Sequence, residues 1–158
     1  MSSQKQDYIL RQIDLLRQAV KRAVRKGPDP ELDEGLLLAF HLQEKLFPVP
    51  PAEFLGLEMP GQIAALRRNE SRESGNAKCR LYAALLAETA KLYDHKGQPD
   101  LAGGARQMGL FAALSVARDD STDREANALA RELLAAIDVQ TLHPPVIALL
   151  EQVRDSAA

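Results

Sequence analysis

Residues 101–117 read LAGGARQMGLFAALSVA, and this stretch decides the fold. Its one charged side chain is Arg106, and apolar or small residues occupy almost every position around a helical wheel. A helix of this kind has no face suited to water, so it belongs in the interior of a helical domain. A membrane span is the other interpretation, but the stretch is short for one and contains Arg106 and Gln107, with charged residues close on both sides. We therefore predict a buried central helix and no membrane association.

One side of this central helix consists of small residues. They are Ala102, Ala105, Gly109, Ala112, Ala113 and Val116. Because small residues let a neighbouring backbone come close, we predict a tight contact between Gly109 and the preceding helix. The adjacent pair Gly103–Gly104 costs about 1 kcal/mol per glycine inside a helix. This pair therefore either frays the first turn or permits a close crossing.

The composition favours a single all-α domain. The 158 residues are 46% hydrophobic, whereas aromatic residues make up only 4% and tryptophan is absent. Runs rich in Val, Ile and Thr are missing, so we expect a strand content near zero. The formal charge of −2 provides no general attraction to nucleic acid or anionic lipid. The single cysteine excludes an internal disulfide, and the N-terminal residues lack the apolar segment of a secretory signal, so we predict a cytoplasmic protein.

We predict about six helices in one domain, residues 1–158. Its parts are an N-terminal helical hairpin at 4–47, an irregular connector with a short helix at 48–76, a second hairpin at 77–117 and closing helices at 122–155. In the first hairpin, Gly27 is placed to end one helix, Pro28 prevents its continuation and Asp29 caps the next. The short link predicts that the two helices lie antiparallel.

The connector is the least regular part of the sequence. Residues 51–55 suggest one helical turn and residues 60–68 a short helix. The polar stretch NESRESGN at 69–76 predicts a mobile loop, in which a functional site could lie. Further along, the spacing of Thr122 and Glu125 fits a capping box at the start of a closing helix.

The second hairpin resembles a tetratricopeptide repeat. The positions that carry the resemblance are Leu86, Ala90, Tyr93, Gly97, Ala102 and Gly109. In order, they match the repeat's first large residue, a small residue, an aromatic residue, the turn glycine, an alanine and a second small residue. The sequence departs from the repeat at Arg106, where an aromatic residue is usual, at Thr89, where leucine is usual, and in lacking the closing proline. One unit is present, whereas an array needs about three.

The wider layout resembles a family of uncharacterised bacterial all-α proteins with a tetratricopeptide-like hairpin. The shared patterns are a D-Y-[IL]-L-R-x-I helix, here Asp7 to Ile13, and a Leu-Gly-Leu connector, here Leu55 to Leu57. The resemblance covers most of the chain. It implies a bacterial cytoplasmic protein of this fold, and it implies no particular activity.

Few residues suggest catalytic or metal chemistry. His41 and Glu44 could reach one metal ion, but a di-metal helical bundle needs such a pair twice, and a second pair is absent. His95 and His143 lie near predicted helix ends, where capping or helix-dipole roles account for them. Phosphate-binding glycine loops and nucleophile elbows are also absent. We therefore predict no catalytic residue, no metal and no cofactor.

Cys79 allows two interpretations. It lies near the predicted start of the third long helix, beside Lys78 and Arg80, whose charges could lower the thiol pKa and make it a nucleophile. Cysteine is also common as a small buried residue, and we favour that interpretation.

Basic residues gather in the second half of the first helix and near the connector. They are Arg17, Lys21, Arg22, Arg25 and Lys26, with Arg67, Arg68 and Arg72 further along. Aromatic residues for base stacking are not interleaved with them, and acidic residues balance them over the whole chain. We interpret these residues as a solvated face with compensation at a helix end, and we expect no nucleic-acid partner.

The first helix has a wider apolar arc than one neighbour requires. Its core stripe is Ile9, Ile13, Leu16 and Val20. A shoulder formed by Tyr8, Leu15 and Ala19 widens the arc to about half of the wheel. Either the C-terminal helices or a second copy of the protein must cover this shoulder, and we favour the second copy as a symmetric homodimer.

These features favour a non-enzymatic protein-interaction or self-association module. One alternative is a small-molecule-binding or enzymatic helical protein that uses the 69–76 loop and His41 or His95. A further alternative is a nucleic-acid-associated protein that uses the basic end of the first helix.

Overall fold

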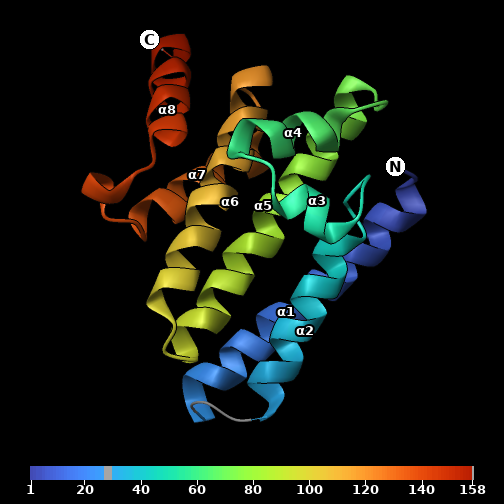
Figure 1. The fold of residues 1–158 in the computed structure, drawn as a ribbon, viewed down its shortest axis with the longest axis vertical. Coiled ribbons are helices and arrows are strands. Elements are labelled where there is room, and N and C mark those ends of the chain that lie inside the picture. The colour runs from blue at the N-terminus through green and yellow to red at the C-terminus, as the bar shows by residue number, and fades with distance from the viewer. Residues whose placement is uncertain (27–29, 158) are drawn as a thin grey trace.

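The computed structural model describes residues 1–26 and 30–157, and these residues form helices and no strands (Figure 1). The elements are α1 (Ser3–Lys26), α2 (Pro30–Glu44), α3 (Pro51–Leu55), α4 (Met59–Arg67), α5 (Arg72–His95), α6 (Pro99–Asp119), α7 (Arg124–Ala135), the 3-10 helix η1 (Val139–Thr141) and α8 (Pro144–Ala157). The prediction of an all-α protein is confirmed for the described residues. They hold eight α-helices rather than about six, because the connector forms both α3 and α4. The predicted roles of Gly27, Pro28 and Asp29 lie outside the described residues.

The antiparallel helices α5 and α6 form the centre of the molecule. In α6, every residue from 107 to 117 is buried, as the apolar stretch predicts. Helix α5 is equally central, with nearly every residue from 75 to 90 buried. The sequence shows this less clearly, because α5 includes charged residues such as Lys78 and Glu88 among the buried ones.

The remaining helices cover the two central ones from opposite sides. Helices α1 and α2 pack against α5, whereas α7 and α8 pack against α6 (Figure 1). Helix α4 packs against α5 and also reaches α6. This arrangement places the C-terminal helices on the far side of the molecule from α1.

The polar stretch 69–76 is not the predicted loop. Helix α5 begins at Arg72, five residues before the predicted start, and the Ser71 hydroxyl caps it by accepting a hydrogen bond from the Ser74 backbone N–H at 3.1 Å. Gly75 and Asn76 are buried within the helix. The prediction was wrong because the polar side chains of this stretch serve as a helix cap and as partners of other helices, which local sequence does not reveal.

The predicted capping box at residues 122–125 is also wrong. Asp123 is the N-cap of α7, and its Oδ1 accepts a hydrogen bond from the Ala126 backbone N–H at 2.9 Å. Thr122 instead donates its hydroxyl to the Asp120 carboxylate at 2.6 Å. The Asp123 carboxylate also accepts a hydrogen bond from Arg80 at 2.6 Å. It therefore caps α7 and forms an ion pair with α5 at the same time.

The glycine pair in α6 produces neither of the predicted effects. The helix begins at Pro99 and continues through Gly103 and Gly104. A Cβ atom added at either position meets no described atom within 4 Å. These glycines therefore face open space, and no helix crosses there. Helix α2 ends at Glu44, three residues before the end of the predicted first hairpin at residue 47, and α8 ends at Ala157, two residues after the predicted end of the closing helices at residue 155.

A cluster of aromatic side chains fixes the connector to α5. Phe54 of α3 is fully buried and stacks on Phe47, with ring centroids 3.9 Å apart. Both rings meet Tyr82 of α5 edge-on, with centroids 5.8 and 6.0 Å away. The Tyr82 hydroxyl donates to Gln62 Oε1 of α4 at 2.8 Å, which satisfies a polar group in this buried cluster. The connector is therefore an ordered part of the core, with α3 and α4 close to the two short helical segments that the sequence suggests.

Candidate functional site

The repeat-like positions lie where α5 and α6 meet and at the turn between them. Leu86, Ala90, Ala102 and Gly109 are buried, and Tyr93 is half-buried beside Phe40 of α2. A Cβ atom added at Gly109 would lie 3.2 Å from the Cβ of Leu86, so the predicted tight contact is present. Gly97 adopts φ +75°, a left-handed conformation that glycine takes without steric cost.

Arg106 departs from the repeat pattern but has a clear partner. Its guanidinium forms an ion pair with the carboxylate of Asp94, across the turn between α5 and α6. A charged pair therefore stands where a tetratricopeptide repeat has an aromatic residue.

The residues proposed for an enzymatic or small-molecule alternative are not brought together. His41 is exposed on α2, His143 is exposed before α8, and His95 is half-buried at the end of α5. Residues 72–76 and His95 occupy opposite ends of the 24-residue α5, about 30 Å apart along the axis. In the described parts of the chain, no three His, Cys, Asp or Glu side chains are grouped as ligands for a metal ion.

Cys79 lies in the interior, with none of its surface exposed. Burial raises the pKa of its thiol to about 11, against the lowering effect of Arg67, Lys78 and Arg80. The neighbouring cations therefore do not activate the thiol, because desolvation of the thiolate outweighs them.

Native Cys79 is expected to react with a maleimide at pH 7.5 at least about 100-fold more slowly than the same thiol in urea. A raised pKa leaves little thiolate, and burial also blocks the reagent. The chain has a single cysteine, so mass spectrometry of labelled protein against time measures this rate directly. Equal rates in native and unfolded protein would show that the thiol is accessible.

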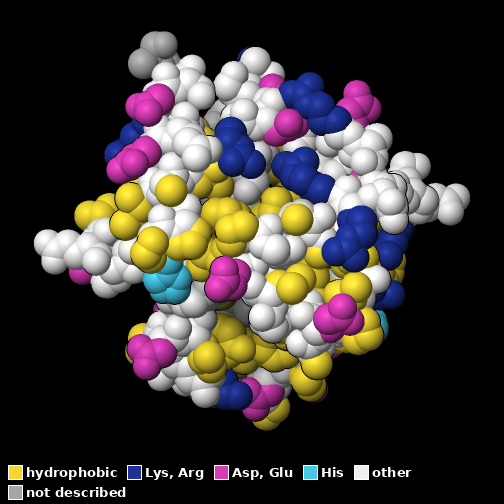
Figure 2. All heavy atoms as spheres, turned by 45° about the horizontal axis from the view of Figure 1, so that its top comes forward, with side chains coloured by type: hydrophobic (Ala, Val, Ile, Leu, Met, Phe, Trp, Pro, Cys, Tyr) yellow, Lys and Arg dark blue, Asp and Glu magenta, His cyan; other side chains and the backbone are white. Residues whose placement is uncertain are grey.

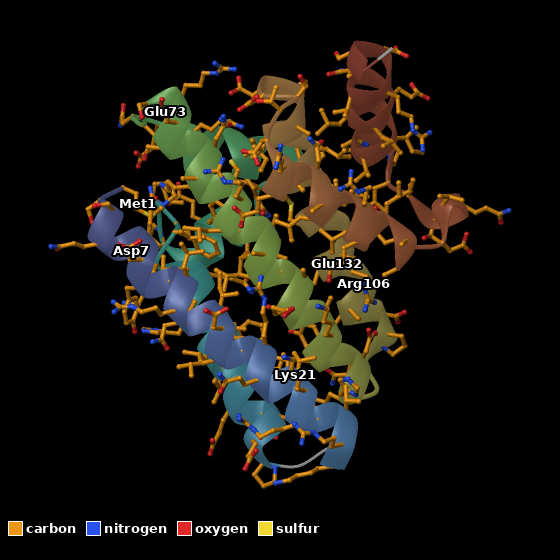
Figure 3. All side chains as sticks on the ribbon, turned by 180° about the vertical axis from the view of Figure 1, so that it is seen from behind. Met1, Asp7, Lys21, Glu73, Arg106 and Glu132 are labelled. Carbon is orange, nitrogen blue, oxygen red and sulfur yellow. The ribbon has the colours of Figure 1, made fainter. Side chains whose placement is uncertain are left out.

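The basic residues form separate groups. Arg17 pairs with Asp14 at 3.2 Å and with the buried Glu88 at 3.6 Å, and Arg22 pairs with Glu31 at 3.1 Å. Figure 3 shows α1 running along the back of α5, with Lys21 in its second half. The end of α4 and the start of α5, which hold Arg67 and Arg72, lie nearer to the N-terminal end of α1 than to its C-terminal end (Figure 1). The cations therefore do not merge into one surface for a nucleic-acid backbone.

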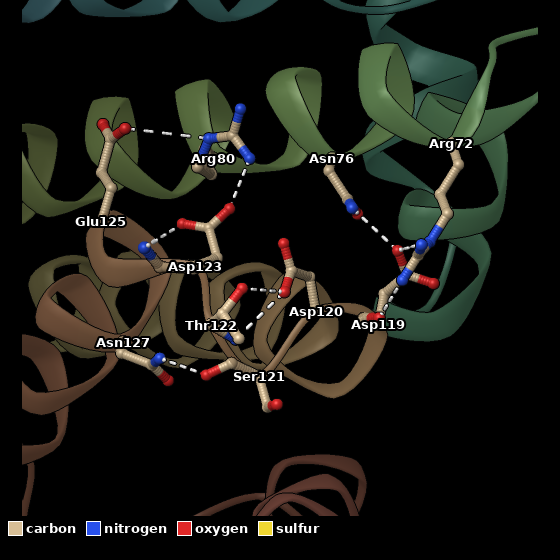
Figure 4. A network of polar contacts seen from close by, with 11 residues as sticks. Arg72, Asn76, Arg80, Asp119, Asp120, Ser121, Thr122, Asp123, Glu125 and Asn127 are labelled. Carbon is tan, nitrogen blue, oxygen red and sulfur yellow. Dashed lines mark hydrogen bonds and ion pairs between the residues drawn. The ribbon is translucent and has the colours of Figure 1, made fainter.

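A polar network joins the start of α5 to the corner between α6 and α7 (Figure 4). The Asp119 carboxylate accepts from Asn76 Nδ2 at 2.8 Å and from Arg72 Nε at 2.7 Å. These donors hold the pKa of Asp119 below its usual range, with the Asn76 hydrogen bond as the largest cause.

The sequence contained a signal for this network. Arg72, Asn76 and Arg80 are spaced four residues apart, so they share one face of α5. The carboxylate that accepts hydrogen bonds from Arg72 and Asn76 belongs to Asp119, which is more than 40 residues away along the chain. The side-chain donors and acceptors are mostly paired with each other, except that Asn76 Oδ1 has no hydrogen-bond partner in the described structure. The network consequently fixes the α6–α7 corner and does not present an open binding site.

The shoulder of α1 borders a groove formed with α2, which we call the hairpin groove. Tyr8 is 38% exposed, Leu15 is 47% exposed and Ala19 is half-buried. The groove has a volume of about 460 Å³, and the residues that line it are Leu15, Leu16, Gln18, Ala19, Arg22, Glu31, Glu34, Gly35 and Leu38. All of them belong to α1 or α2. The C-terminal helices therefore leave this apolar surface uncovered.

A second groove, the α8 groove, lies between α4, α6 and α8 and has a volume of about 440 Å³. It is lined by Pro60, Ile63, Ala64, Arg67, Phe111, Ser115, Arg118, Pro145, Ala148, Leu149 and Gln152. Figure 2 shows hydrophobic side chains gathered on this side of the molecule with Lys and Arg side chains beside them. No local sequence pattern indicates this groove, because its walls come from helices that are distant along the chain.

None of the described helices is both long and apolar enough to cross a membrane. Comparisons with known protein families, curated proteins and solved structures found no match to this chain.

Proposed function

We propose that this protein is a non-enzymatic interaction module that pairs with a second copy of itself through the hairpin groove. The observation that carries the proposal is the exposure of Tyr8 and Leu15, although α1 already packs on both α2 and α5. Burying apolar surface contributes about 25 cal/mol per Å², so an uncovered apolar face on a packed helix favours association.

The charges around the hairpin groove suit an antiparallel two-fold arrangement. Lys45, which follows the end of α2, lies over the Tyr8 ring of α1, 5.4 Å from its centroid, outside the residues that line the groove. Glu31 and Glu34 line the groove near the start of α2, where Arg22 pairs with Glu31. A two-fold axis perpendicular to the helices brings the Lys45 end of one copy over the Glu34 end of the other. Two hairpins then form a four-helix interface.

The tetratricopeptide-like character of α5 and α6 is part of this proposal, as is a bacterial cytoplasmic setting. The close approach at Gly109 and the left-handed turn at Gly97 support a compact helical hairpin of that kind. Proteins built from such hairpins present helix faces to other proteins, which agrees with an interaction module. This support comes from analogy of fold, so the test of function below does not depend on it.

Wild-type protein is expected to sediment at twice the monomer mass at micromolar concentration. The double variant Tyr8→Glu/Leu15→Glu is expected to sediment as a folded monomer, because it places charge on the apolar surface of both copies. Analytical ultracentrifugation measures the mass, and far-UV circular dichroism measures the helix content. Both replaced side chains are partly exposed, so the substitutions leave the fold intact.

The matched control is Leu37→Glu, which replaces a leucine that is 67% exposed on α2 and does not line the hairpin groove. This variant is expected to remain a dimer. A monomeric wild type throughout the micromolar range contradicts the proposal, as does a double variant that remains dimeric and folded.

A further inference from the structure

The α8 groove has the shape of a small-molecule site. Residues 60, 63, 64 and 67 of α4 line one wall and residues 145, 148, 149 and 152 of α8 line another, each with the spacing of one helical face. Each wall therefore covers about two helical turns, or about 10 Å. This length is short for a partner helix, which uses anchors over several turns. The volume of about 440 Å³ lies within the range of ligand pockets.

The groove combines an apolar interior with two cations. Ile63, Phe111 and Leu149 provide apolar contact surface. Arg67 and Arg118 also line the groove. Such a combination matches a molecule with an apolar body and an anionic head.

Neither arginine is neutralised by a carboxylate within ion-pair distance in the described structure. Arg118 donates one hydrogen bond to Gln152 Oε1 at 3.2 Å, between the α6 and α8 walls. Arg67 packs its side chain against Gly75, where an added Cβ would lie 3.3 Å from Arg67 Cγ and 3.4 Å from Arg67 Nη1. The charge of Arg67 contributes to lowering the pKa of Asp119, but the Asp119 carboxylate accepts its hydrogen bonds from Arg72 and Asn76. Both guanidinium groups therefore retain donors for a bound anion.

We propose that the α8 groove binds a medium-chain monocarboxylate, with the apolar chain against Phe111 and Leu149 and the carboxylate at Arg67 and Arg118. A planar carboxylate accepts two parallel hydrogen bonds from a guanidinium, which favours it as the head group. This inference uses a different surface from the hairpin groove and is independent of self-association.

Isothermal titration calorimetry with sodium decanoate, kept below its micelle concentration, tests the proposal on the full chain. We expect one saturable site with a dissociation constant between about 10 µM and 1 mM. Shortening the ligand to octanoate is expected to weaken binding about tenfold, because two methylene groups lose their contact with the groove. Decanol has the same chain without the charge and is expected to bind at least about tenfold more weakly than decanoate.

Two kinds of variant locate the site. Arg118→Gln and Arg67→Gln are each expected to weaken decanoate binding about tenfold. Ala148→Trp adds a large side chain from an exposed position on the α8 wall and is expected to abolish binding. The matched control is Arg131→Gln, which removes an exposed arginine on α7 outside the groove and is expected to bind like the wild type.

The proposal is overturned by absence of saturable decanoate binding or by decanol binding as tightly as decanoate. It is also overturned if Ala148→Trp binds like the wild type. Arg67→Gln could destabilise the fold, because Arg67 contacts Gly75. In that case Arg118→Gln alone tests whether the arginine charge is needed for binding. Unchanged decanoate affinity in Arg118→Gln then overturns the proposal. Ultracentrifugation tests self-association through the hairpin groove, so its outcome neither supports nor contradicts ligand binding in the α8 groove.

Discussion

Replacing Phe54 with alanine is expected to lower the free energy of unfolding by about 3–5 kcal/mol. The ring is fully buried and stacks on Phe47, and it also meets the edge of Tyr82. Helix α3 has five residues and no side-chain N-cap, so local propensity contributes little to its stability. Loss of the ring therefore leaves a cavity and also releases the segment that carries it.

Urea unfolding followed by far-UV circular dichroism measures this effect, and amide hydrogen exchange reports the opening of α3. The matched control is Leu55→Ala, which changes the neighbouring side chain, 58% exposed, and should alter the stability by less than about 0.5 kcal/mol. Equal stabilities for the two variants would mean that the aromatic cluster does not hold the connector.

Gly109→Leu is expected to lower the free energy of unfolding by at least about 1–3 kcal/mol. An added Cβ atom alone would lie 3.2 Å from Leu86 Cβ and 3.3 Å from Leu133 Cδ1, in contact with both α5 and α7. The rest of a leucine side chain has no room without separating these helices. The improved helix propensity, worth about 1 kcal/mol relative to glycine, does not offset this crowding.

The same substitution one and a half turns earlier provides the control. Gly104 lies on α6 and faces open space, so Gly104→Leu is expected to raise the stability by about 0.5–1 kcal/mol through helix propensity alone. Thermal and urea unfolding of the two variants should therefore move in opposite directions. A Gly109→Leu variant as stable as the wild type would place Gly109 outside a close contact.

Long periodic segments were predictable because helix formation depends on neighbours within one or two turns. The apolar stretch at 101–117 predicted a buried helix, and α6 is buried from 107 to 117. The tight contact at Gly109 was also predictable, since the missing side chain marks a place where another helix can approach. The short segments that became α3 and α4 were visible from their prolines and apolar spacing.

The candidate sites depended on contacts that the sequence does not display. Residues 69–76 look like a solvent-exposed loop because they are polar, yet Asn76 is buried against Asp119, a residue 43 positions later. Cys79 lies between two cations in the sequence, but burial controls its pKa. The shoulder of α1 was predictable as an apolar face, whereas only the packing of α7 and α8 against α6 shows that they do not cover it.

The sequence by itself determined the all-α class, the central position of α6 and the approximate extent of most helices. Periodicity, helix propensity and breaker residues are local properties, so they can be read along the chain. The tertiary structure decided which polar residues became buried partners and where α4, α6 and α8 leave the α8 groove. Those features depend on helices far apart in the sequence, and their relative positions follow from packing of side chains that no local pattern encodes.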